Sequence, residues 1–296
     1  MKKPFRQIPS IVILSVVFFF NPLNSVSQIP DKTLTSESDS AKAGSSSHSL
    51  FGGAGYGSNM IYLGSTISHD QPYSYAAFSY GYKNGFYATI SSVHLSDMDP
   101  FFAINTATIS YNHVFNSWFD IASGISYYNV APSLTETLFS SFLFGNLTVG
   151  FDWRLLYSKL SIGGLFSEDN SAFFQFRNSR YFQTPDFTSK KLFFSIDPYV
   201  NLICGPLTTA ETVEGSTIKL SPPYGKGGKN GQLSSTTQFS TKFSFLEIDF
   251  GIPVALNSDR FILEAEPGYI LPFYKNDFSP GTKGFLFSLS FYFRIL

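Results

Sequence analysis

Cysteine and charge are both scarce in this chain of 296 residues. The single cysteine, Cys204, excludes a disulfide within the chain. Only 14% of the residues are charged, and 20 Lys and Arg nearly balance 21 Asp and Glu, which argues against a nucleic-acid partner. The four histidines show no metal-ligand spacing in any expected strand or helix. The sequence therefore predicts a fold without disulfides, and neither a metal site nor a cofactor.

Long apolar runs are missing too, except near the N-terminus. Three basic residues precede the apolar run Ile11–Phe20, and Ser25-Val26-Ser27 follows with a small-x-small pattern. The run is too short for a membrane-spanning helix, which needs roughly 20 residues. We therefore predict a secretory signal peptide over Met1–Ser27. Beyond it no stretch shows a convincing amphipathic helix or a helical membrane span.

Aromatic residues are abundant instead, with 34 Phe and 17 Tyr, and they alternate with polar residues. The last stretch, Gly284–Leu296, shows this pattern most clearly at the two-residue period of a strand. One face carries Phe285, Phe287, Leu289, Phe291, Phe293 and Ile295, and the other carries Ser288, Ser290, Tyr292 and Arg294. Since no helix is available to cover the apolar face, lipid is the expected cover.

This terminal strand resembles the C-terminal strand of Gram-negative outer-membrane β-barrel proteins, which the assembly machinery of that membrane recognises. The resemblance implies a location in the outer membrane, with outer-membrane lipid and that assembly machinery as partners. It leaves the oligomeric state open. Aromatic richness without helical spans in an exported chain is also typical of membrane barrels with aromatic girdles.

The remaining pattern predicts a single all-β domain, an antiparallel transmembrane β-barrel of about 12 strands, with 10 as the alternative if weak strands are dropped. Residues Gln28–Ser49 are polar and predict a disordered leader, so that the barrel covers Leu50–Leu296. The expected strands are Leu50–Thr66, Tyr73–Lys83, Phe86–Ser96, Ala103–Phe115, Trp118–Val130, Phe139–Trp153, Leu156–Phe166, Ala172–Gln183, Leu192–Cys204, Thr241–Val254, Phe261–Phe273 and Gly284–Leu296. Ala172–Gln183 alternates poorly and reads equally as a loop.

Alternation also assigns the two faces of the barrel. Lipid contacts are expected for Ile121, Leu147, Val149, Leu246, Ile248, Phe250, Phe287, Leu289 and Phe291. The long polar insert Gly205–Gln238 is expected to be an extracellular surface loop, because short turns of such barrels face the periplasm and long loops face outward.

The charged residues expected to line the lumen are Asp120, Asp152, Asp197, Glu247, Asp249, Glu264, Glu266 and Arg294. They are consistent with a cation-attracting channel lining, with catalytic carboxylates, or with a salt-bridged network that fills a narrow barrel, which is the interpretation we favour. A hairpin centred near Phe278–Pro280 further predicts an ion pair between Glu264 and Arg294.

We expect a non-enzymatic structural barrel or narrow pore with an acidic polar lumen and no catalytic residue. One alternative is a barrel enzyme, either a lipid hydrolase or a protease. The spacing His94-Leu95-Ser96 resembles the His-x-Ser pair of the outer-membrane phospholipase, but the likeness is two residues long. A secreted soluble β-sandwich, in which the aromatic faces form the core, is the other alternative.

Overall fold

A computed structural model gives the fold of the chain. It describes residues 48–62, 65–68, 70–83, 85–135, 138–167, 170–187, 192–211, 217–220, 238–273 and 283–296. The predicted signal peptide lies outside these residues, as does the predicted leader except for His48 and Ser49, which begin the first strand. No helix among the described residues is long and apolar enough to cross a membrane.

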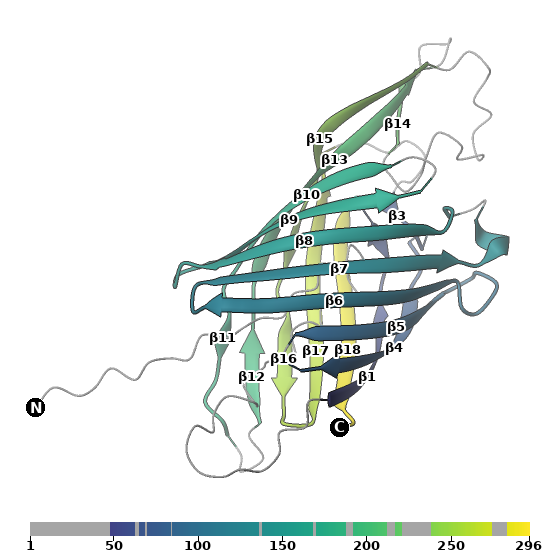
Figure 1. Cartoon of the computed structure of the whole chain (residues 1–296). Helices are drawn as coiled ribbons and strands as arrows, with labels where there is room; N and C mark the ends of the chain where they lie inside the picture. The colour runs from purple at the N-terminus through teal and green to yellow at the C-terminus, as the bar shows by residue number, and fades with distance from the viewer. Residues whose placement is uncertain are drawn as a thin grey trace, which may run out of the picture.

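The fold is a closed antiparallel β-barrel (Figure 1). Its strands are β1 (His48–Gly57), β4 (Tyr73–Tyr82), β5 (Phe86–Leu95), β6 (Ile104–Asn116), β7 (Phe119–Val130), β8 (Phe142–Asp152), β9 (Tyr157–Phe166), β10 (Ser171–Ser179), β11 (Phe182–Gln183), β12 (Phe193–Ile196), β13 (Tyr199–Glu211), β15 (Gln238–Gly251), β16 (Val254–Asn257), β17 (Phe261–Pro272) and β18 (Gly284–Arg294). β18 pairs with both β17 and β1, so the sheet closes on itself. The closed barrel contradicts the alternative of a β-sandwich.

Three barrel strands are each interrupted once, at one level of the wall. β10 continues as β11, β12 as β13, and β15 as β16, because each pair keeps one register against its neighbour. Pro198 lies at the break between β12 and β13 and faces Arg180 at the break between β10 and β11. Pro253 lies at the break between β15 and β16, where Ile252 faces Pro267 of β17. Proline has no N–H to give to the ladder. Counting each interrupted strand once gives the predicted number, 12.

The connections differ in length at the two ends of the barrel. At one end, which we call the turn end, residues 83–85, 117–118, 153–156 and 258–260 join neighbouring strands, and the longer segment 184–192 joins β11 to β12. At the other, which we call the loop end, the connections include 58–72 and 131–141. The second of these holds a short 3-10 helix, η4 (Pro132–Leu134). β1 begins and β18 ends at the turn end, as an even strand number requires.

Three short strands lie outside the barrel path and correct two predictions. The first predicted strand ends at Gly57, and the small hairpin of β2 (Ile61–Tyr62) and β3 (Ser65–Thr66) follows it. The predicted loop Gly205–Gln238 is partly strand: β13 runs on to Glu211, β15 begins at Gln238, and β14 (Thr217–Leu220) pairs with β13. The extended β13–β15 hairpin rises past the neighbouring strands in Figure 1.

The outer face of the barrel is apolar along its whole wall. Ile109, Ile125 and Leu147 are 70%, 57% and 50% exposed, and the apolar face of β18 is exposed from Phe285 to Phe293. The predicted outward positions are confirmed, with Leu246 as the exception. Aromatic rings gather at the turn end, where Phe115, Phe119, Trp118, Phe151 and Trp153 contact one another in a row. Such a row is typical of the aromatic girdle at a membrane interface.

Leu246 points into the barrel, contrary to the prediction that it contacts lipid. It is 0% exposed, whereas Phe243 and Phe245 before it are exposed on the outside. The pairing of β13 with β15 shifts by one residue at this point, between Ile203 and Cys204. Such a β-bulge places two consecutive residues, here Leu246 and Glu247, on the same side and reverses the alternation. The outward positions after the bulge are therefore even-numbered.

The hydrophobic core of the protein lies inside the barrel, at the loop end. We call it the apolar cluster. Its members are Met60, Ile67, Tyr73, Tyr75, Ala77, Val93, Leu95, Ala103, Ile104, Tyr128, Val130, Ala131, Leu134, Leu138, Phe139, Phe142, Phe144, Leu165, Phe173, Ile203 and Leu246. They come from the loop-end halves of strands β4 to β15 and from the loops above them. The loop-end half of the interior is therefore packed like a protein core.

Inward glycines of β1 allow aromatic rings to lie flat against the wall. The rings of Tyr292, Tyr75 and Tyr73 cover Gly53, Gly55 and Gly57, where an added Cβ would overlap them. At Gly55 the Cβ would also meet the main-chain oxygen of Leu289, which cannot rotate away. Tyr75 donates to the Ser290 hydroxyl at 2.9 Å, so these rings also tie β4 to β18 across β1.

Candidate functional site in the barrel lumen

The charged residues predicted to line the lumen all lie on the side of their strands opposite the exposed apolar residues. Asp197, Glu247, Asp249 and Glu264 are buried. Asp120, Asp152, Glu266 and Arg294 are partly buried. Their strands bring the acidic residues together from β7, β8 and the β12–β17 part of the wall.

Two basic residues of the inner wall were missed by the sequence reasoning. Lys159 of β9 and Arg177 of β10 are register partners. The alternation of the exposed residues Leu160 and Ile162 could have assigned Lys159 to the inside. On β10, Phe174 and Phe176 are exposed and leave Arg177 on the inner side. The poor alternation of this strand concealed that assignment.

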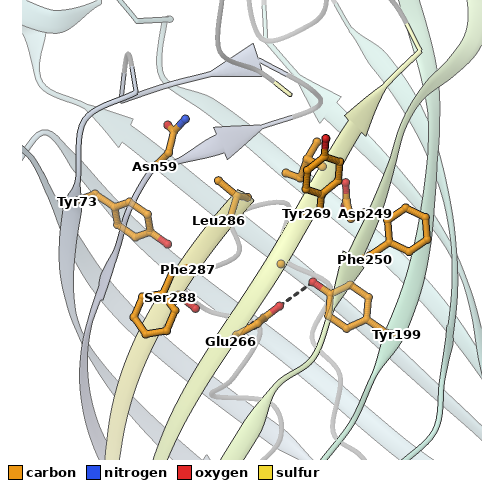
Figure 2. A pocket seen from close by; sticks show the side chains of 12 residues that line it. Asn59, Tyr73, Tyr199, Asp249, Phe250, Glu266, Tyr269, Leu286, Phe287 and Ser288 are labelled. Carbon is orange, nitrogen blue, oxygen red and sulfur yellow. Dashed lines mark hydrogen bonds between the residues drawn. The ribbon is translucent and has the colours of Figure 1, made fainter. Parts of the chain in front are cut away.

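Arg177 begins a chain of contacts that crosses three strands. Its guanidinium lies 3.7 Å from the centroid of the Tyr199 ring, a cation–π geometry. The Tyr199 hydroxyl donates a hydrogen bond to Oε1 of Glu266 at 2.7 Å (Figure 2). Arg177 also interacts electrostatically with Asp249 and Glu266. One cation is thus shared between two carboxylates.

A second chain of contacts joins Lys159 to Asp120. The Lys159 ammonium lies 5.3 Å from the centroid of the Tyr157 ring. The Tyr157 hydroxyl donates to Oδ2 of Asp120 at 2.7 Å. In both chains a tyrosine lies between a basic and an acidic side chain. Its ring contacts the cation and its hydroxyl donates to the carboxylate, so a narrow interior can hold both charges.

The opposite part of the inner wall, on β4 to β9, carries a set of uncharged hydroxyls in addition to Asp120, Asp152 and Lys159 near the turn end. Hydroxyls on neighbouring strands share hydrogen bonds of 2.9 Å in the pairs Ser79–Thr89, Thr108–Ser126 and Thr148–Ser161. Cross-strand hydroxyl pairs of this kind stabilise a sheet. The lumen therefore has a hydroxyl wall facing a charged wall.

The predicted ion pair between Glu264 and Arg294 is wrong. Glu264 lies opposite Ser290, and Arg294 is four residues further along β18, about 13 Å away at the rise of a strand. Nε of Arg294 donates to the carbonyl oxygen of Leu296 at 2.9 Å. The predicted hairpin centre was two residues too late, and an error in the centre of a hairpin doubles in its register.

The pair His94 and Ser96, singled out for its likeness to a phospholipase, lies at the loop end of β5. Nδ1 of His94 is 2.9 Å from the carbonyl oxygen of Phe101, and the two rings stack with centroids 4.2 Å apart. Ser96 follows the end of the strand. The described residues contain no group of three or more His, Cys, Asp or Glu arranged to hold a metal ion.

The barrel has no free edge within its wall, an apolar exterior with an aromatic row, and a polar and charged inner face. Among the described residues, the closed strand ladder pairs main-chain groups without water, which suits a lipid surround. The chain folds as a membrane-spanning β-barrel.

Comparisons with known proteins find similarity to solved structures. No protein-family model and no curated sequence matches the chain. Among solved structures it is similar to the NanC porin, with 9% identity over 82% of this chain and 98% of the porin and a TM-score of 0.44. It is also similar to a bacterial polysaccharide outer membrane secretin, with 8% identity over 84% and 98% and a TM-score of 0.40. The outer membrane protein Omp33 of Acinetobacter baumannii follows, with 8% identity over 84% and 98% and a TM-score of 0.37.

Proposed function

We propose that this barrel is a narrow outer-membrane channel that prefers cations. The supporting observation is the excess of carboxylates on the inner face of the β12–β18 part of the wall. Asp197, Asp249 and Glu266 lie near Arg177, and Glu264 lies on the same wall toward the turn end. A narrow lumen surrounded by lipid focuses this charge, which attracts cations and repels anions.

The apolar cluster makes the channel narrow and mostly closed toward the loop end. Its side chains are packed to near-zero exposure, with Phe173, Leu165 and Leu246 among them. Apolar constrictions block ion flow by excluding water. The expected single-channel conductance is therefore low, and opening requires displacement of loop residues from the barrel interior.

Ion selectivity in planar bilayers tests the proposal. In a potassium chloride gradient, the reversal potential of the full-length protein should have the sign of potassium preference. The double variant Asp249→Asn with Glu266→Gln should shift that potential toward zero. Asp259→Asn, an exposed carboxylate in the β16–β17 turn, is the matched control and should leave the potential unchanged. Chloride preference in the wild type would reject the proposal.

A structural barrel is the second candidate, and the apolar cluster is the observation that favours it. A lumen packed by loop residues such as Leu134, Leu138 and Phe139 contributes stability whether or not ions pass. For a structural role, a protein that migrates as a folded, heat-modifiable barrel in detergent gels should show no discrete conductance steps.

The expectation of no catalytic role is retained in this proposal. His94 engages the Phe101 carbonyl oxygen rather than Ser96 in its hydrogen bonding. A lipid hydrolase would release fatty acid from phospholipid vesicles containing the folded protein. Release that is lost in His94→Ala would reject the non-enzymatic assignment.

We also infer that the turn end faces the periplasm and the loop end faces outward. The contrast in connection length supports this orientation. Protease added to intact cells should cut between β13 and β15, in the part of the predicted insert that lies outside the described residues. Cleavage only after permeabilisation of the outer membrane would invert the orientation.

A further inference from the structure

A pocket lies in the inner wall of the barrel where β13, β15, β17 and β18 are neighbours (Figure 2). Its polar lining comes from Tyr199, Asp249, Glu266 and Ser288. Tyr73 of β4, on the far side of β1, also lines it. Its empty volume is about 380 Å³ with the open mouth included. The part enclosed by these side chains admits one small polar group.

Glycines keep the pocket open. Tyr199, Gly251 and Gly268 lie opposite one another on three neighbouring strands. The Tyr199 ring lies against Gly251, where an added Cβ would overlap it. Gly268 lines the pocket itself, and a Cβ there would approach the Phe250 carbonyl oxygen to 3.1 Å. The rings and carboxylates therefore surround space and not another side chain.

One residue that lines the pocket, Asp249, carries a carboxylate oxygen that the described residues do not satisfy. Asn201 and Asp249 are register partners, and Nδ2 of Asn201 donates to Oδ2 of Asp249 at 2.9 Å. Their remaining oxygens, Oδ1 of each residue, have no hydrogen-bond partner among the described residues. Asp249 is only 7% exposed and Asn201 only 4%. A buried acceptor without a donor costs about 1–3 kcal/mol, and a charged one more.

The local charge is negative. Asp249 and Glu266 both line the pocket, and Arg177 is the cation that interacts with both. Asp197 adds to the negative potential at Glu266. Because the described residues hold no group of three metal-binding side chains, the site does not suit a chelated divalent metal ion. A singly charged group with several N–H donors matches both the acceptor and the charge.

We propose that this pocket binds the primary ammonium group of a small solute. Oδ1 of Asp249 accepts one of its N–H bonds, Glu266 contributes negative charge, and the Tyr73 and Tyr199 rings flank its short apolar part. The inference rests on the proposed cation-preferring channel and deepens it, since it names the class of cation and the place in the lumen where it binds.

Calorimetric titration of the full-length protein, folded in detergent, tests this site with ethylammonium chloride. Tetramethylammonium chloride at the same ionic strength carries the same charge without an N–H donor. The wild type should bind ethylammonium saturably and tetramethylammonium not at all. Asp249→Asn should weaken ethylammonium binding by about tenfold or more. Asp259→Asn removes an exposed carboxylate in the β16–β17 turn, outside the pocket lining, and should leave binding unchanged.

Ser288→Leu provides a second, uncharged test, because it fills the pocket from β18 and keeps both carboxylates. It should abolish ethylammonium binding. The site is rejected if the wild type shows no saturable binding, if tetramethylammonium binds as well, or if Asp249→Asn and Asp259→Asn lose binding equally. Titration does not require ion flow. A non-conducting barrel that binds ethylammonium would reject the channel and keep the pocket, and a conducting barrel without binding would do the reverse.

Discussion

The two ends of the barrel interior are built from different residues on the same strands. β8 shows the change most clearly: Phe142 and Phe144 are each 2% exposed at the loop end, and Asn146 and Thr148 follow on the same face. The outer face of β8 does not change in this way, since Leu143, Leu147 and Phe151 are apolar along its length. The exterior is uniform and the interior is divided.

This difference shows which constraint acts on each surface. Lipid requires an apolar exterior at every level of the wall. The interior is free of that requirement, so its residues reflect what the lumen must hold. A packed apolar half and a charged half fit a passage that concentrates cations on one side of a closed constriction.

Truncation of Leu246 should break the apolar half and produce the largest loss of stability. Leu246→Ala removes a side chain that is 0% exposed within the apolar cluster, so it should cost about 2–5 kcal/mol. Urea unfolding from lipid vesicles measures it. Ile125→Ala is the matched control on the outside, 57% exposed, where lipid fills the space. Equal losses for the two variants would contradict a packed interior.

A charge on the exterior tests the reversal of faces at the bulge. Ile248 is an outward position after the bulge, so Ile248→Arg should cost about 2–4 kcal/mol if it lies near the bilayer midplane. Thr241→Arg, on the exposed extension of the same strand, should cost far less. The same unfolding measurement compares the two variants, and an Ile248→Arg substitution without loss of stability would contradict the assigned faces.

The division into two faces was predictable from alternation, because lipid imposes it on every strand. The outward residues Phe285 to Phe293 of β18 follow that rule, as do Ile109 of β6 and Ile125 of β7. The apolar cluster was not predicted. Inward Phe142 and Phe144 look like outward residues when small polar side chains are taken as the only mark of a lumen.

Strand registers and β-bulges could not be predicted from the sequence, for a different reason. An alternation pattern is unchanged when a hairpin slides by two residues, so the Glu264 and Arg294 assignment had correct faces and a wrong pairing. The bulge at Leu246 leaves no mark in the local pattern, since Phe245, Leu246 and Ile248 are all apolar. Lys159 and Arg177 become a pair only through the register of β9 with β10.

Removal of one hydroxyl from the charged wall should have a smaller effect than either core change. Tyr199→Phe deletes the donor to Glu266, a charged acceptor, and should cost about 1.5–3 kcal/mol. Tyr127→Phe alters an outward ring that is 48% exposed and should be nearly neutral. If both variants unfold at the same urea concentration as the wild type, the tyrosine-bridged network adds nothing to stability.

The hydroxyl wall should give the smallest effect. Ser126→Ala removes one partner of the buried Thr108–Ser126 hydrogen bond and should cost about 0.5–1.5 kcal/mol. Ser123→Ala, on the opposite side of β7, is the control and should unfold like the wild type. A larger loss than that of Tyr199→Phe would reverse the ranking of the two walls.

The comparison of the two halves is tested most directly by the single-channel conductance of a variant with a reduced apolar cluster. The double variant Phe144→Ala with Phe173→Ala removes two rings that are at most 2% exposed in the loop-end half, and it leaves the charged half intact. Ile109→Ala with Ile125→Ala is the control on the lipid side. The interior variant should have a higher single-channel conductance than the wild type and keep its preference for potassium. The control variant should have the conductance of the wild type. An interior variant with unchanged conductance would contradict the claim that the apolar cluster constricts ion flow through the barrel.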